Sequence, residues 1–66
     1  MLEEYSLVKS LKDVPENNIK VGDIGTVVHC YTKPREAYEV EFLDEEGYTK
    51  GVLTYEYCEL ESVEQG

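Results

Sequence analysis

The side chains with the greatest chemical reactivity are one histidine and two cysteines, His29, Cys30 and Cys58. A histidine beside a cysteine could supply the base and the nucleophile of a catalytic dyad. His29 and Cys30, however, are neighbours in a run that is predicted to be a strand, where successive side chains point to opposite faces. We therefore expect no dyad: Cys30 is interpreted as a small buried hydrophobe, and His29 as an ordinary strand residue that could act as a sensor near neutral pH.

The pattern of acids, cysteines and glycines predicts no other catalytic or metal site. Two widely spaced cysteines without a Cys-x-x-Cys group do not supply a zinc site, and without a secretion signal they are expected to be reduced thiols. Asp44, Glu45 and Glu46 lack the ligand spacing of a calcium loop and favour a solvated hairpin turn. No glycine-rich phosphate loop is present. We expect a protein that is not an enzyme, with no catalytic residue, no metal and no cofactor.

The negative charge lies in the second half of the chain. The net charge is −9; residues 1–35 hold five acids and five bases, whereas residues 36–66 hold ten acids and only Lys50 as a base. Such a field repels phosphate backbones and attracts basic surfaces, less strongly as salt rises. Most of the six tyrosines lie in this acidic half, where bases could not stack beside a positive groove, so nucleic-acid binding is not expected.

Acids and tyrosines together predict a protein-binding surface in the acidic half. Tyrosine offers a large amphipathic face with few torsions, and surrounding carboxylates would steer a basic partner toward it. The alternative is that Tyr38 and one or two other tyrosines belong to the core and that the carboxylates only solvate the protein. Binding of proline-rich peptides stays open, although no tryptophan is present to form a groove wall. The candidate partner-binding residues are Tyr55, Tyr57, Glu56, Glu59, Glu61, Glu39 and Glu41.

Length and hydropathy indicate one small domain, residues 1–66. A chain of this size buries only about 60% of its unfolded surface and cannot build a second core. Its 41% of hydrophobic residues occurs in short runs, none near the ~20 apolar residues of a membrane span, and the start of the chain lacks the layout of a signal peptide. We expect a cytoplasmic protein with no membrane partner.

Alternating apolar residues and turn residues predict five short strands that must position these side chains. Residues 37–43 give the clearest alternation, with Tyr38, Val40 and Phe42 inward. Val52 and Leu53 are expected to be core residues of the fourth strand. Gly25 marks a bend, a bulge or a close approach in the second strand. The predicted strands are residues 5–9, 24–32, 37–43, 48–54 and 59–63.

The connections complete the predicted fold. Residues 10–20 form a long structured arm in which Leu11, Val14 and Ile19 cap the core. Gly22 supplies a positive φ in the turn that follows, and Asp23 bonds back to the local backbone. Residues 55–58 form a one-turn helix, and residues 64–66 are expected to lack fixed structure. This arrangement is typical of a mainly β fold, a small five-stranded SH3-like barrel, which hides sheet edges.

Four segments resemble a known family. They are Asp13-Val14-Pro15-Glu16, Gly22-Asp23-Ile24-Gly25-Thr26-Val27-Val28, Tyr38-Glu39-Val40-Glu41-Phe42 and Leu53-Thr54. In this order they resemble the small bacterial proteins of the domain-of-unknown-function family number 4926, over residues 5–63. The resemblance implies an SH3-like barrel and no catalytic motif. It also implies an association with toxin-like genes, in which such a protein is an immunity or antitoxin partner.

Two functions are predicted. The first is a non-enzymatic binding module that docks a basic protein through its acidic C-terminal half, as an immunity or antitoxin-type partner. The second is a structural or regulatory accessory domain that forms homo-oligomers through an exposed strand or through the arm. Binding of a small ligand is not expected, because inward side chains fill a barrel of this size.

Overall fold

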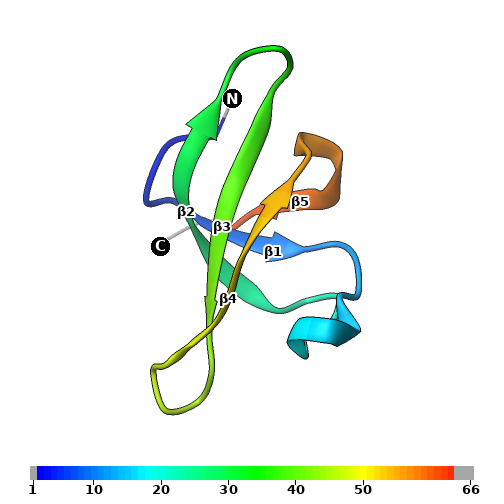
Figure 1. Ribbon diagram of the computed structural model, residues 1–66, viewed down its shortest axis with the longest axis vertical. Coiled ribbons are helices and arrows are strands. Elements are labelled where there is room, and N and C mark those ends of the chain that lie inside the picture. Colours follow the sequence, from blue (N-terminus) through cyan, green and yellow to red (C-terminus); the bar gives the residue numbers. More distant parts are fainter. Residues whose placement is uncertain (1, 64–66) are drawn as a thin grey trace.

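Five antiparallel strands form one sheet in the computed structural model, which describes residues 2–63 (Figure 1). The sheet order is β4-β3-β2-β1-β5, and two 3₁₀ turns, η1 and η2, are the only helical elements among these residues. The prediction of a mainly β fold is confirmed. The predicted unstructured tail, residues 64–66, lies outside the described residues. The elements are β1 (Leu7–Ser10), η1 (Pro15–Asn17), β2 (Ile24–Tyr31), β3 (Ala37–Leu43), β4 (Thr49–Tyr55), η2 (Tyr57–Glu59) and β5 (Leu60–Ser62).

Strand β3 has the bounds and the orientation that its alternation predicts. Tyr38, Val40 and Phe42 are buried, and the residues between them are half-buried on the opposite face. The hairpin to β4 closes through Gly47, whose φ of 89° lies in the left-handed region that glycine adopts without a Cβ clash. The alternation is informative here because β3 is a central strand with one face on the core.

A register shift between Val27 and His29 interrupts β2, as expected for a β-bulge. Before the shift Gly25 and Val27 are buried, and after it Cys30 is half-buried against the core. The regular strand would have put Val27 and Cys30 on opposite faces, so the bulge returns Cys30 to the inner side. Gly25 is needed for a close approach, because a Cβ there would lie 2.7 Å from Val40 Cγ1.

Strand β1 begins later than residue 5, so the predicted start is wrong. Tyr5 has a φ of 65° and its side chain is 74% exposed, which places it in a turn before the strand. Val8 and Ser10 are the fully buried residues of β1. A strand that starts after this left-handed turn presents Val8 and Ser10 to the core.

The arm between β1 and β2 folds back on the core, as predicted, through Ile19 and Val14. Ile19 is buried, Val14 packs against the core, and an isolated antiparallel bridge joins the two residues. Leu11 is exposed, so its predicted capping role is wrong. The turn that ends the arm has the predicted features: Gly22 has a φ of 99°, and Asp23 Oδ2 accepts the N–H of Lys20 at 3.0 Å.

Strand β4 extends one residue beyond its predicted end and includes Tyr55. In the β3–β4 ladder Tyr55 pairs with Tyr38, and its side chain is completely buried. Val52, by contrast, is 47% exposed, so its predicted core position is wrong, and Leu53 is half-buried against the core. The one-turn helix is η2, which starts two residues later than predicted.

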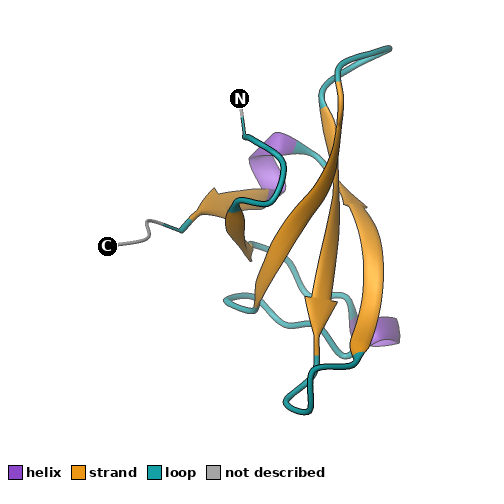
Figure 2. Cartoon of the chain, turned by 90° about the vertical axis from the view of Figure 1, so that its left-hand side faces the viewer, coloured by secondary structure: helices purple, strands orange, loops and turns teal. Residues whose placement is uncertain are grey.

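The sheet is curved, as Figure 2 shows from the side, and most of the core side chains come from its strands. This shape is compatible with the SH3-like barrel that the sequence suggests. The core side chains are Val8, Ile19, Val27, Tyr38, Val40, Phe42, Tyr55 and Leu60.

Candidate functional site: the acidic hairpin face

Tyr55 and Tyr57, the two aromatic members of the predicted binding surface, have different environments. Tyr57 is 54% exposed, with its ring centroid 6.4 Å from that of Tyr38. Tyr55 has no exposed surface. The expectation that Tyr55 offers its ring to a partner is therefore wrong, because β4 turns that side chain inward.

The contacts of Tyr55 are those of a core residue. Its hydroxyl is 2.7 Å from Ser10 Oγ in a buried hydrogen bond, and its ring packs on Phe42 with centroids 5.8 Å apart. Lys12 Nζ lies 4.7 Å from the ring centroid, within cation–π range. These contacts join β4 to β1 and to the start of the arm.

Glu56, Glu59 and Glu61 are already paired with cations of the same chain. Glu56 is 3.2 Å from Arg35, Glu59 is 3.0 Å from Lys12, and Glu61 is 3.4 Å from Lys9. These cations come from the first half of the chain, which sequence spacing does not reveal. Since each pair neutralises one carboxylate, this part of the predicted surface attracts a basic partner less than its composition suggests.

Glu59 also closes the first turn of η2. Its Oε1 accepts the N–H of Glu56 at 2.9 Å, as in one half of a capping box. This backbone hydrogen bond and the Lys12 ammonium lower the pKa of Glu59, against the opposing effect of burial. Because the folded-state pKa is the lower one, Glu59 stabilises the fold above the ordinary carboxyl pKa, and the contribution disappears as pH falls through the folded-state value.

Replacing Glu59 with glutamine is expected to lower the free energy of unfolding by about 1 kcal/mol near neutral pH. The difference between the two proteins should shrink at about pH 3, where the carboxylate of the parent is increasingly protonated. Urea unfolding at both pH values measures this. Glu45→Gln, at an exposed turn position, is the matched control and should change little. An equal difference at both pH values would contradict the ionic role of Glu59.

Glu39 and Glu41 lie on the outer face of β3 and take part in none of the ion pairs found among residues 2–63. Glu39 accepts the hydroxyl of Thr54, and Glu41 accepts that of Thr49 at 2.9 Å. These hydrogen bonds orient the carboxylates but leave their charge uncompensated.

Exposed apolar residues that were not among the predicted site residues lie beside these carboxylates. Leu43 is 52% exposed, and Val52, which pairs with Glu41 across the ladder, is exposed on the same face. Ile24, also exposed, continues this surface onto β2. The signal that could have found Leu43 is the alternation itself, because a strand that turns Tyr38, Val40 and Phe42 inward turns Leu43 outward.

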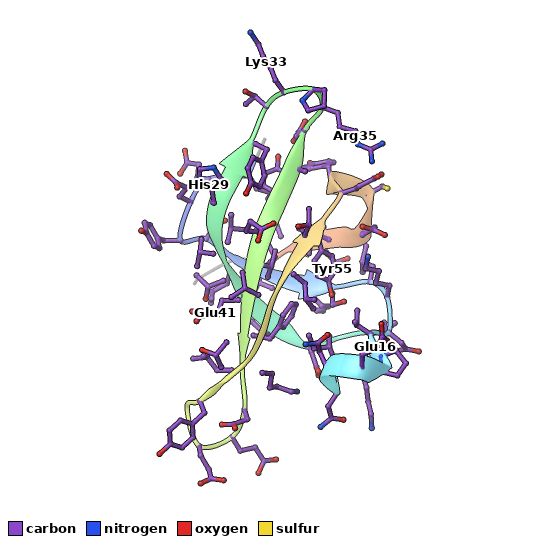
Figure 3. The ribbon with its side chains drawn as sticks, viewed as in Figure 1. Glu16, His29, Lys33, Arg35, Glu41 and Tyr55 are labelled. Atoms are coloured by element: carbon purple, nitrogen blue, oxygen red, sulfur yellow. The ribbon has the colours of Figure 1, made fainter. Side chains whose placement is uncertain are left out.

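The turn between β3 and β4 adds three exposed carboxylates, Asp44, Glu45 and Glu46. None of the three is in an ion pair with another residue of the described part of the chain, and Asp44 Oδ1 accepts the N–H groups of Glu46 and Tyr48, both at 2.9 Å. Lys33 and Arg35 lie on the β2–β3 loop at the opposite end of the sheet (Figure 3). We call the outer face and turn of this hairpin the acidic hairpin face: Glu39, Glu41, Leu43, Asp44, Glu45, Glu46 and Val52.

Residues 4–62 match the family model described as Domain of unknown function (DUF4926). The chain belongs to this family. No curated protein and no solved structure matches the chain at a significant level. The predicted family is therefore confirmed. The all-β fold of this DUF4926 chain is compatible with the SH3-like barrel that the resemblance implies.

The reactive side chains of the DUF4926 chain do not converge on one site. Exposed His29 lies 3.8 Å from Glu4 and packs edge-on against Tyr31, whereas half-buried Cys30 lies toward the core. Burial, with the nearby charges of Glu4 and Glu36, raises the pKa of Cys30 and keeps its thiol protonated. Among the described residues no group of three or more His, Cys, Asp or Glu is placed to hold a metal ion.

An open groove of about 600 Å³ lies at the other end of the hairpin and carries both signs of charge. Lys12, Lys33 and Arg35 supply cations, and Glu56 and Glu59 supply the carboxylates that pair with two of them.

Within the described part of the chain no helix is long and apolar enough to cross a membrane. Unlike the groove, the acidic hairpin face combines exposed apolar side chains with carboxylates that have no cation partner among residues 2–63.

Proposed function

We propose that this DUF4926 chain is a non-enzymatic protein-binding module that docks a basic protein on its acidic hairpin face. The observation that carries the proposal is the set of five carboxylates from Glu39 to Glu46, none of them in an ion pair within residues 2–63, next to exposed Leu43 and Val52. With Lys50 as the only base, the hairpin of residues 37–55 has a net charge of −4, five acids against one base.

This arrangement suits association in two stages. Uncompensated carboxylates on one face raise the association rate of a basic partner, and this effect weakens as salt screens the charges. Burial of Leu43, Val52 and neighbouring Ile24 would then slow dissociation, because apolar area removed from water stabilises the complex. An immunity or antitoxin-type protein that neutralises a basic toxin is the biological role we propose for such a module.

The proposed surface differs from the one predicted by composition. Glu39 and Glu41 are kept from the original set. Glu56, Glu59 and Glu61 become secondary because each already has a cation partner, and Tyr55 is excluded by its burial.

Charge reversal on the hairpin tests this proposal. The variant Glu41→Lys with Glu45→Lys should reduce capture of a basic partner from the source cell by at least about tenfold, since it removes two attractive charges and adds two repulsive ones. The control, Glu56→Lys with Glu61→Lys, changes the net charge by the same amount at positions already paired with cations. Capture is measured by affinity purification and mass spectrometry at low and high salt. A partner held equally by both variants, or unaffected by salt, would refute the proposal.

Self-association remains the second candidate because β4 is a long strand at the edge of the sheet. The arm is a weaker route to an oligomer, since Ile19 and Val14 are used by the protein's own core. Two copies that meet at β4 would bring together two hairpins of like charge. This candidate therefore predicts a mass in sedimentation experiments that increases with salt, opposite to the salt response of a complex with a basic partner.

A further inference from the structure

The two edges of the sheet are unequal. In the order β4-β3-β2-β1-β5, one edge is β5, with three residues, and the other is β4, with seven. An edge strand exposes unpaired N–H and C=O groups, and natural proteins protect long edges with proline, charge or bulges. Between Gly51 and Tyr55 the strand has no proline and no charged residue, so this part of β4 lacks those protections.

The register determines which backbone groups of β4 face outward. Val27 N–H donates to Ser6 O, and Val27 O accepts the N–H of Tyr5, so the polar groups of Val27 face β1. Successive residues of a strand alternate in this direction, so the groups of Thr26 face β3 and bond to its partner Glu41.

The same alternation continues from β3 to β4. The backbone N–H and C=O groups of Glu41 point toward β2. Those of Val40 and Phe42 must therefore point toward β4, where their partners are Leu53 and Gly51. The residues between and after these partners, Val52 and Thr54, therefore point their N–H and C=O groups away from the sheet.

These outward groups lack partners in the described chain. Asn17 Nδ2 reaches the edge only at its beginning, where it donates to the carbonyl of Lys50 at 3.3 Å. No hydrogen bond from another segment of residues 2–63 reaches the N–H or C=O of Val52 or Thr54, and both residues are exposed. Four backbone groups in a row are thus free to pair with another strand.

The charge of the surface around β4 indicates which kind of strand would bind at this edge. The acidic turn of residues 44–46 lies just before β4. An added strand would lie two strands, about 10 Å, from Glu39 and Glu41, a span that lysine or arginine side chains can largely cover. A second copy of this chain would instead bring an equally acidic hairpin to the same edge.

We propose that the free edge of β4 binds an extended, basic segment of a protein partner as an added β-strand, through the outward backbone groups of Val52 and Thr54. In this mode main-chain hydrogen bonds supply affinity, and alternate side chains supply specificity. The inference rests on the proposed function, because it names the form in which the basic partner is recognised.

A synthetic peptide of about eight residues that alternates lysine and valine tests this proposal, since β4 itself has seven residues. The control peptide has the same sequence and charge, with N-methyl groups on backbone amides of both edges, because a peptide methylated along one edge could pair through the other. Amide hydrogen exchange by NMR should show about tenfold slower exchange at Val52 and Thr54 with the first peptide. The methylated peptide should bind about tenfold more weakly, because it loses two or more hydrogen bonds.

Variants of the protein give a second measurement. Val52→Pro removes an outward N–H but no hydrogen bond of the sheet, which makes it a position where an edge strand can accept proline. It should weaken binding of the unmethylated peptide by about tenfold relative to Val52→Ile, which keeps both the N–H and the apolar side chain. If Val52→Pro does not fold, the comparison of the two peptides on the parent protein decides.

Three outcomes would overturn strand addition. Equal binding of both peptides would leave charge-driven docking intact but refute pairing at the edge. Unchanged exchange at Val52 and Thr54 with saturating peptide would do the same. Slow exchange at these amides in the free protein, together with a dimer mass, would assign the edge to a second copy. Failure of the proposed function is distinguished by the charge-reversal experiment, in which partner capture would not respond to Glu41→Lys with Glu45→Lys.

Discussion

Replacing Tyr55 with alanine is expected to lower the free energy of unfolding by about 3–5 kcal/mol. The side chain is fully buried, packs on Phe42, and bonds to Ser10 through its hydroxyl, so its removal leaves a cavity and a buried serine with one partner fewer. A domain of this length is stable by roughly 3–10 kcal/mol, so the variant should be largely unfolded or close to it. Urea unfolding followed by circular dichroism measures the loss.

Tyr57→Ala is the matched control for this prediction. Tyr57 is exposed, and its ring makes a tilted contact with that of Tyr38, so we expect a loss of about 0.5–1 kcal/mol. Tyr55→Phe, which keeps the ring and removes the hydroxyl, should cost about 1 kcal/mol. Equal losses of stability for Tyr55→Ala and Tyr57→Ala would contradict the burial of Tyr55 in the core at the C-terminal end of β4.

Replacing Gly25 with alanine should cost about 2–3 kcal/mol, a large loss for the addition of one methyl group. The new Cβ would lie 2.7 Å from Val40 Cγ1 and 2.9 Å from both Glu41 O and Phe42 Cε1. Two of these atoms belong to the core, and the third is backbone in the adjacent strand, so relief requires β2 and β3 to separate. The midpoint of urea unfolding should fall without a change in its slope.

Gly51→Ala is the control for crowding at a glycine in the same sheet. Its Cβ would lie 2.6 Å from Asn17 Nδ2, the end of a flexible side chain that can rotate away. The cost is then mainly the hydrogen bond from Asn17 to Lys50 O, about 1 kcal/mol. A loss at Gly51 as large as that at Gly25 would show that the close approach of β2 and β3 is not the cause.

Both proposals concern the same hairpin and differ in what they require of it. Docking on the acidic hairpin face needs only uncompensated charge and exposed apolar side chains. Strand addition needs the free backbone groups of Val52 and Thr54 as well. Charge-reversal variants act on the first requirement and N-methylated peptides on the second, so the two can fail independently.

The sequence by itself was sufficient for the class of fold and for the elements whose neighbours are local. Strand β3 follows from its alternation, and the turn at Gly22 follows from the need for a positive φ. The arm was also predictable, since Val14 and Ile19 are apolar residues in a polar loop. In each case the physical cause, a periodicity or a backbone requirement, acts within a few residues.

Only the tertiary structure showed that Tyr55, at the C-terminal end of β4, is buried, and which carboxylates of the described residues lack a cation partner. Tyr55 and Tyr57 look equivalent in the sequence, but pairing with Tyr38 makes Tyr55 a core residue. Glu56 and Glu61 likewise resemble Glu39 and Glu41 until Arg35 and Lys9 are seen beside them. Strand pairing and ion pairing join residues distant in the chain, so composition could indicate a charged half but not which of its carboxylates are free.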